Sequence, residues 1–196
     1  MSESRFEVEV KIPLEKTEQL EAALLEIGAR KLNTETQVDA YFDHPCRSFP
    51  ETDEAIRIRS RQPHSDDDQV VPDDRPLTEM TYKGPKVDPL SKTRVELSVG
   101  LDDSREAELI LTQLGFKPIA EVTKIRSFYS MRDITISIDD VIDVGIFLEL
   151  ERVVEHEAQI ASAREGIFAV VRELGLNPEE SIRDSYLEMY LGKQPL

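Results

Sequence analysis

Alternation of charged and apolar side chains is the feature that most narrows the possible folds of this 196-residue chain. In the segment FEVEVKI, residues 6–12, the charged residues Glu7, Glu9 and Lys11 occupy every second position. Side chains of a strand alternate between its two faces, so this strand has one charged face and one apolar face. Further segments of strand character span residues 38–43, 54–61, 77–84, 93–100, 122–131, 134–139 and 145–152. The pattern predicts about eight strands that share a charged face.

Apolar residues at helical spacing predict helices as well as strands, which makes the expected fold class α+β. Pro13 suits the first turn of one such helix and Gly28 its end. Asp103 or Ser104 is expected to cap a second helix, and Gly115 to close it. The predicted helices span residues 13–30, 103–115, 156–175 and 178–192. Each has an apolar face that requires burial, so we expect the helices to pack against the sheet.

Composition excludes several classes of protein. The chain has 40 acidic and 24 basic residues and a net charge of −16, which argues against nucleic acid as a partner and is typical of adaptation to high salt. The single Cys46 cannot form a disulfide within the chain, and no run approaches the roughly 20 apolar residues of a membrane helix. We expect a soluble, cytoplasmic protein with one domain over residues 1–196, in which residues 62–76 form a flexible acidic loop.

Basic residues at one phase of the strands indicate an anionic ligand. A sheet with one solvated face is the simplest explanation of polar alternation. Closely spaced pairs such as Arg57 and Arg59 would nevertheless repel each other unless an anion lay between them. If the strands closed into a barrel, these side chains would converge on its interior, with the helices packed outside. Arginine and lysine at this density suit a chain of phosphates.

Acidic residues share the same phase and suggest a metal. Carboxylate oxygens are hard ligands, and Mg²⁺ or Mn²⁺ is commonly held by a few carboxylates together with substrate phosphates. The residues concerned are Glu7, Glu9, Glu96, Asp139, Glu149 and Glu151. The two signs of charge therefore predict a single site for a phosphate chain and a divalent cation.

The motif Glu-x-Glu-x-Lys at residues 7–11 resembles the defining motif of the CYTH superfamily, the triphosphate tunnel metalloenzymes. The resemblance continues in order through VDAYFDHP, TDEAIRIR, MTYKGPK, SKTRVE, VTKIRSFY, ISIDDV, GIFLELE and SYLEMYL, and thus covers nearly the whole chain. It implies a closed eight-stranded antiparallel β-barrel, a tunnel that binds triphosphates with Mg²⁺ or Mn²⁺. A homodimer is expected by analogy with the family.

The resemblance also implies roles for individual residues. The triphosphate contacts would be Lys11, Arg57, Arg59, Lys83, Arg94, Lys124 and Arg126, and all of these except Arg59 and Arg94 would be catalytic. The metal ligands would be Glu7, Glu9, Asp139, Glu149 and Glu151. Glu96 could serve either purpose or pair with Arg94, while Lys86 and Lys92 are equally well explained as solvated lysines. Lys11→Ala is expected to abolish turnover with little loss of stability.

Within the superfamily, the segments at residues 41–45, 52–59 and 81–86 are most similar to class IV adenylyl cyclases. The implied reaction converts ATP into 3′,5′-cyclic AMP and pyrophosphate. The same tunnel could instead hydrolyse thiamine triphosphate or tripolyphosphate, or bind polyphosphate or nucleotide without catalysis. In each case the partner is a small triphosphate, ATP or thiamine triphosphate being the leading candidates, and not a nucleic acid or a membrane.

Overall fold

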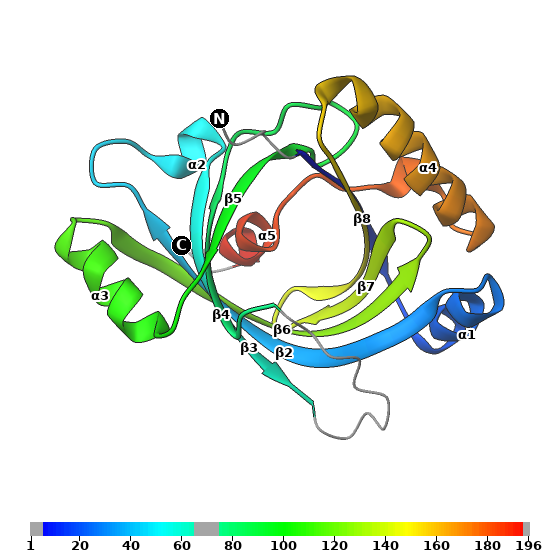
Figure 1. Ribbon diagram of the computed structural model, residues 1–196, viewed down its shortest axis with the longest axis horizontal. Helices are drawn as coiled ribbons and strands as arrows, with labels where there is room; N and C mark the ends of the chain where they lie inside the picture. Colours follow the sequence, from blue (N-terminus) through cyan, green and yellow to red (C-terminus); the bar gives the residue numbers. More distant parts are fainter. Residues whose placement is uncertain (1–5, 65–74, 194–196) are drawn as a thin grey trace.

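The computed structural model describes residues 6–64 and 75–193, which form a closed barrel of eight antiparallel strands (Figure 1). The strands are β1 (Phe6–Leu14), β2 (Arg30–Asp43), β3 (Ala55–Pro63), β4 (Thr78–Lys83), β5 (Arg94–Gly100), β6 (Lys117–Met131), β7 (Ile134–Val141) and β8 (Gly145–Val154). Their order around the barrel is β1-β5-β4-β3-β2-β6-β7-β8. The predicted closed eight-stranded barrel is confirmed, and the sheet is left without a free edge.

The barrel is closed by ladders of very different length. β1 pairs with β8 along its whole length, from Phe6 opposite Val154 to Leu14 opposite Ile146. On its other side β1 meets β5 only at Phe6 and Glu7. β2 and β6 are the longest strands, with 14 and 15 residues, and they pair across most of their length. The sequence pattern had placed the start of β2 at residue 38, eight residues after the strand begins.

The hydrophobic core lies outside the barrel, between its apolar outer faces and the helices. Val8, Val10 and Ile12 of β1 are buried together with Leu24 of α1 (Glu18–Glu26) and Ile167 of α4 (Ile160–Glu173). These contacts occupy the apolar phase of the strands, so the charged phase must face inward. The assignment of the two faces from the alternation is therefore correct.

Two helix predictions can be compared directly with the structure. α3 (Ser104–Gln113) begins as expected, because the Asp103 side chain accepts hydrogen bonds from the backbone N–H groups of Arg105 and Glu106. The helix expected from Pro13 starts later. Pro13 and Leu14 belong to β1, where they pair with β8, and α1 begins at Glu18. α2 (Phe49–Thr52) is a four-residue helix that the sequence pattern did not predict.

The C-terminal segment departs most from its predicted form. The expected helix over residues 178–192 is interrupted, because the Ile182 N–H donates to the Lys11 carbonyl at 2.8 Å and forms an isolated bridge with β1. Only a short 3₁₀ turn (Pro178–Glu180) precedes the bridge, and α5 (Tyr186–Lys193) follows it. The bridge directs α5 across one end of the barrel, where Figure 1 shows it within the ring of strands.

Two further predictions concern the loop at residues 62–76 and the absence of a membrane helix. The expected flexible loop at residues 62–76 falls mainly on residues 65–74, which lie outside the described part of the chain. None of the helices in the described ranges is long and apolar enough to cross a membrane.

Candidate functional site

The barrel encloses a cavity of about 570 Å³, a volume typical of small-molecule sites. Its wall is formed by inward-facing side chains of the strands, together with α2 and α5. Ten of the twelve predicted site residues line the cavity, and these are Glu7, Glu9, Arg57, Arg59, Lys83, Arg94, Lys124, Arg126, Glu149 and Glu151. The two exceptions, Lys11 and Asp139, are fully buried behind the wall.

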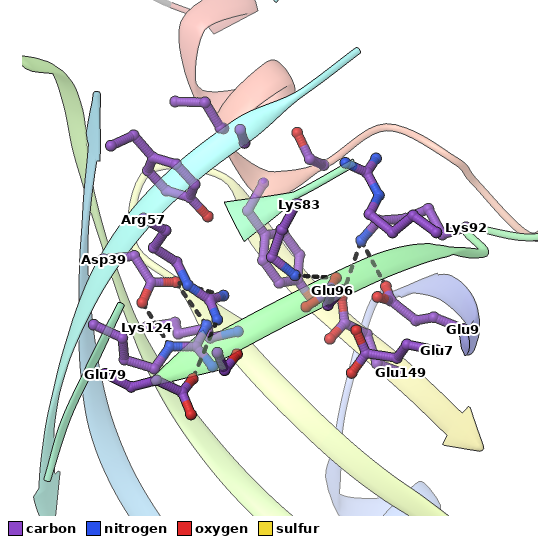
Figure 2. Close-up of a pocket in the computed structure, with 18 of the residues that line it drawn as sticks. Glu7, Glu9, Asp39, Arg57, Glu79, Lys83, Lys92, Glu96, Lys124 and Glu149 are labelled. Atoms are coloured by element: carbon purple, nitrogen blue, oxygen red, sulfur yellow. Dashed lines mark hydrogen bonds and ion pairs between the residues drawn. The ribbon is translucent and has the colours of Figure 1, made fainter. Parts of the chain in front are cut away.

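One part of the wall is organised around Asp39 of β2. Its carboxylate accepts two hydrogen bonds from Arg59, at 2.6 Å and 2.7 Å. The same carboxylate lies 3.7 Å from Arg57 (Figure 2). Burial alone would raise the pKa of Asp39, but Arg59 and Arg57 hold it well below its usual range. Arg57 keeps its Nε without a hydrogen-bond partner among the described residues. The Arg57 guanidinium is thus positioned by Asp39 and still has donor capacity for an anion.

A second group of cations lies near the junction of β1 and β5. Lys92 donates to Glu9 at 2.7 Å, and Lys83 donates to Glu96, as Figure 2 shows. Arg94 lies 3.5 Å from Asp53. Lys92 is fixed in this place by its own backbone, since its N–H donates to the Glu9 carbonyl at 3.0 Å. The cavity is consequently bounded by cations from several strands.

Several wall residues were missed or undervalued in the sequence. Lys92 was weighed equally as a solvated lysine because it precedes the strand, yet it has the same parity as Arg94 and lines the cavity. Asp39 lies within the predicted strand at residues 38–43 but was not named as a site residue, and the earlier residues of β2 fell outside that predicted strand. The inward residues of β2 alternate through Asn33, Glu35, Gln37, Asp39 and Tyr41, a signal that the longer strand makes visible.

Lys86, unlike Lys92, does not line the cavity. Its Nζ donates to Asp53 at 2.6 Å and its backbone N–H donates to the same carboxylate at 2.8 Å. A weaker ion pair joins it to Glu188 of α5 at 3.5 Å. Lys86 therefore connects the segment before β5 to α2 and α5, and it does not form part of the cavity wall.

Four carboxylates from neighbouring strands form the acidic part of the wall. Glu7 and Glu9 of β1 face Glu149 and Glu151 of β8 across the ladder, and Glu9 is directly opposite Glu151. Burial raises the pKa of Glu7, with Glu151 and Glu96 adding to the effect. Burial likewise raises the pKa of Glu9, and Glu149 adds to it. Crowded carboxylates of this kind are stabilised by a nearby cation.

The four carboxylates provide part of a site for a divalent metal. Across residues 6–64 and 75–193, no three His, Cys, Asp or Glu side chains converge as a complete metal centre requires. The hard oxygen donors and their mutual repulsion nevertheless suit Mg²⁺ or Mn²⁺. Such ions are normally bound by one or two carboxylates, with the remaining ligands supplied by substrate phosphates and water. The residues fit a metal that binds together with the phosphate chain.

Asp139 has partners unlike those of the four glutamates. Its carboxylate accepts hydrogen bonds from Arg126, from Lys124 at 3.2 Å and from the Tyr186 hydroxyl at 2.8 Å. Burial would raise its pKa, but Arg126 and Lys124 lower it. The carboxylate is thus ionised and neutralises the cations that turn toward the cavity from β6.

Lys11 is covered by the C-terminal segment. Its Nζ donates to the Asp184 carbonyl at 2.8 Å and lies 3.8 Å from the centre of the Tyr186 ring. Glu149 is 3.5 Å away. The side chain is therefore as much a structural link between β1 and the segment before α5 as a potential ligand contact. Only the tertiary structure shows this second set of contacts.

Lys124 is expected to make the binding of an anion dependent on pH. Burial lowers the pKa of Lys124 to about 7, with Arg126 lowering it further and Asp139 opposing the shift. The ammonium group is charged below this pH and neutral above it, so affinity for an anion should fall as the pH rises. We expect the Kd for tripolyphosphate, measured by calorimetry, to increase about tenfold between about pH 7 and about pH 8.5. Lys124→Arg should flatten this profile, since arginine remains charged. An identical profile in both proteins would show that Lys124 is not the titrating group.

Comparison with known proteins agrees with this fold. The wall of cations and carboxylates inside a closed eight-stranded barrel defines a triphosphate tunnel fold. The family model of the CYTH domain matches residues 5–186, and the chain belongs to this family. The family comprises metal-dependent triphosphate tunnel enzymes.

Individual relatives cover nearly the full chain. A Methanocaldococcus jannaschii protein named as a candidate adenylate cyclase is 36% identical over 184 residues, which are 94% of this chain and 98% of that protein. The adenylate cyclase CyaB of Aeromonas hydrophila is 27% identical, with coverage of 94% and 88% respectively. The solved structure of the PH1819 protein of Pyrococcus horikoshii superimposes with a TM-score of 0.83 at 35% identity, covering 96% of this chain and 99% of that one.

Proposed function

We propose that this protein is an adenylyl cyclase that converts ATP into 3′,5′-cyclic AMP and pyrophosphate with the help of Mg²⁺ or Mn²⁺. The observation that carries the proposal is the arrangement of the tunnel wall, where the cations Arg57, Lys92 and Arg94 share one cavity with the crowded carboxylates Glu9 and Glu149. Two similar proteins bear adenylate cyclase names, which supports the same reaction over others of the family.

In the proposed reaction, the tunnel cations bind the triphosphate and stabilise its developing charge. The ribose 3′-oxygen attacks the α-phosphorus, the bond from that phosphorus to the bridging oxygen breaks, and pyrophosphate leaves. Arg57 offers forked donors to phosphate oxygens, Arg59 offers the N–H groups that Asp39 leaves unused, and Lys92 adds a point charge. Because these groups are held by Asp39 and Glu9 before the ligand binds, little reorganisation is needed.

In this reaction the carboxylates would bind the metal and accept the proton of the 3′-hydroxyl. Glu9 and Glu149 would hold the divalent cation, which supplies charge that favours deprotonation of the 3′-hydroxyl. Glu9 would accept the hydroxyl proton, since burial, with Glu149 adding to the effect, raises the pKa of Glu9 above its ordinary value. Lys124 and Arg126, neutralised in the resting protein by Asp139, would turn their remaining donors toward the phosphates.

A product assay tests the proposal. The protein is incubated separately with ATP, thiamine triphosphate and tripolyphosphate, each with Mg²⁺ or Mn²⁺ at low and at molar salt, and the products are resolved by chromatography. We expect cyclic AMP and pyrophosphate from ATP. Release of orthophosphate from thiamine triphosphate or tripolyphosphate, with ATP left intact, would identify a hydrolase instead. Binding without any product would identify a non-catalytic tunnel.

A further inference from the structure

The seam between β1 and β5 is only partly closed by strand pairing. β5 pairs with β1 at Phe6 and Glu7. The next contact along β1 comes from a residue that precedes β5, because the Lys92 N–H donates to the Glu9 carbonyl at 3.0 Å. At Glu9 the wall is therefore continued by the connection between β4 and β5, residues 84–93, which Figure 1 shows reaching the start of α4. The position of Lys92 in the cavity wall depends on this connection.

The connection makes a tight turn immediately before Lys92. The Asp88 Oδ1 atom accepts hydrogen bonds from the Leu90 N–H at 2.7 Å and from the Ser91 N–H at 2.9 Å. Ser91 and Thr93, on either side of Lys92, are fully buried, and their hydroxyl oxygens lie 2.7 Å apart. The carboxylate of Asp88 thus fixes the backbone that leads into Lys92.

Arg164 of α4 holds the same carboxylate from outside the barrel. Its Nη1 donates to Asp88 Oδ2 at 2.5 Å, and the two side chains are only 14% and 10% exposed. The helix gives Arg164 a firm base, since Ala163 and Ile167 are buried in the core between α4 and the barrel. Both oxygens of Asp88 are therefore engaged, one by the turn and the other by a charge-assisted hydrogen bond from α4.

The turn matters to the site because the Lys92 side chain extends from it into the cavity wall. Lys92 Nζ donates to Glu9 at 2.7 Å and lies 4.0 Å from Glu149. A lysine ammonium attracts phosphate as a point charge, and the attraction falls with distance. A displacement of the turn would move this charge relative to a bound phosphate, although Arg164 itself does not line the cavity.

We propose that Arg164 is a positioning residue for triphosphate binding, and that it acts through Asp88 by fixing the turn from which Lys92 reaches the tunnel. This inference rests on the proposed use of the tunnel as a triphosphate site, and it does not depend on which product is formed. A purely structural role, in which Arg164 only holds α4 on the barrel, makes a different prediction, because its loss would then affect binding whether or not Lys92 is present.

A double-mutant cycle between Arg164 and Lys92 tests the coupling. Affinity for tripolyphosphate is measured by calorimetry in EDTA for Arg164→Ala, Lys92→Ala and the double variant. Arg164→Ala is expected to weaken binding about tenfold in the wild-type background and less than about twofold when Lys92 is already alanine. Arg164→Lys keeps the charge opposite Asp88 and should bind within about threefold of wild type. Arg172→Ala removes the same charge from an exposed position of the same helix and should leave the affinity within about twofold.

Hydrogen exchange at the Lys92 amide, followed by NMR, provides a readout without any ligand. We expect this amide, which is bonded to the Glu9 carbonyl, to exchange about tenfold faster in Arg164→Ala, whereas the amide of Ile167 in α4 should stay within about twofold of its wild-type rate. Asp88→Asn retains an oxygen for the turn but loses the charge opposite Arg164, and it should accelerate exchange at Lys92 in the same way. This second variant decides the matter if Arg164→Ala does not fold.

The inference is supported by a loss of affinity that requires Lys92, together with faster exchange of the Lys92 amide. It is overturned if Arg164→Ala weakens binding equally with and without Lys92, or if the Lys92 amide is unaffected in both Arg164→Ala and Asp88→Asn. Failure of the wild-type protein to bind tripolyphosphate would overturn it together with the proposed function. Normal binding and coupling, without cyclic AMP from ATP, would refute only the cyclase reaction.

Discussion

Asp139→Asn is expected to destabilise the protein by about 3 kcal/mol, the lower end of the range for removing one partner of a buried ion pair. The asparagine would leave Lys124 and Arg126 without their shared counter-charge in a fully buried position. Two features limit this loss of stability. Arg126 retains its contact with Glu149, and Lys124, whose pKa is about 7, can release its proton. Urea unfolding in EDTA measures the effect in the absence of any metal.

Glu151→Gln is the matched control for Asp139. Glu151 opposes Glu9 across the β1–β8 ladder and helps to raise the pKa of Glu7, so its neutralisation relieves repulsion. We expect unchanged or slightly greater stability in EDTA and a higher Mg²⁺ or Mn²⁺ requirement for turnover. If Asp139→Asn showed this behaviour instead, with its unfolding midpoint unchanged, Asp139 would belong to the metal ligands, as the family resemblance implies.

Arg57→Ala is expected to lower kcat/KM by roughly a thousandfold, the scale of loss for an arginine that stabilises phosphoryl transfer. The fold should survive, because Asp39 keeps both of its hydrogen bonds with Arg59. Steady-state kinetics with the substrate found in the product assay, together with a thermal melt, would separate loss of activity from loss of structure.

Arg61 on the same strand provides a control for Arg57. Both side chains belong to the inward phase of β3, but Arg61 binds Glu35 with two hydrogen bonds, of 2.8 Å and 2.6 Å, and does not line the cavity. Arg57→Lys should lose most activity because lysine lacks the forked donors, whereas Arg61→Lys should retain it. Equal kinetics in the two lysine variants would contradict the role assigned to Arg57.

The sequence predicted the inner face of the barrel well because strand alternation is a local property. Once residues 6–12 form a strand, Glu7 and Glu9 must lie on one side and Val8 and Val10 on the other, whatever the rest of the chain does. Where a strand was predicted from the sequence, the side chains that it contributes to the cavity wall could be predicted as well. Where the length of a strand was underestimated, as in β2, the residues before its predicted start, such as Glu35, were missed.

Pairing between charges could not be predicted in the same way. Asp139 and Arg126 are register partners, so a carboxylate that resembles a metal ligand in sequence is used to neutralise two basic side chains. The sequence predicted that Lys11→Ala would abolish turnover with little loss of stability, but the buried contacts of Lys11 with Asp184 and Tyr186 now predict a loss of stability as well. Both outcomes depend on residues far away in the chain.

The sequence by itself determined the strand phases, the charged interior and the family, since each follows from spacing over a few residues or from motifs in fixed order. The tertiary structure alone decided where the C-terminal segment lies. A single backbone hydrogen bond from Ile182 to Lys11 interrupts the predicted helix and directs α5 across the tunnel. That bond joins residues 171 positions apart, and local periodicity carries no information about contacts at such separation. The part of the cavity lining that α5 contributes, with Leu187 and Leu191, is a consequence of the same long-range contact.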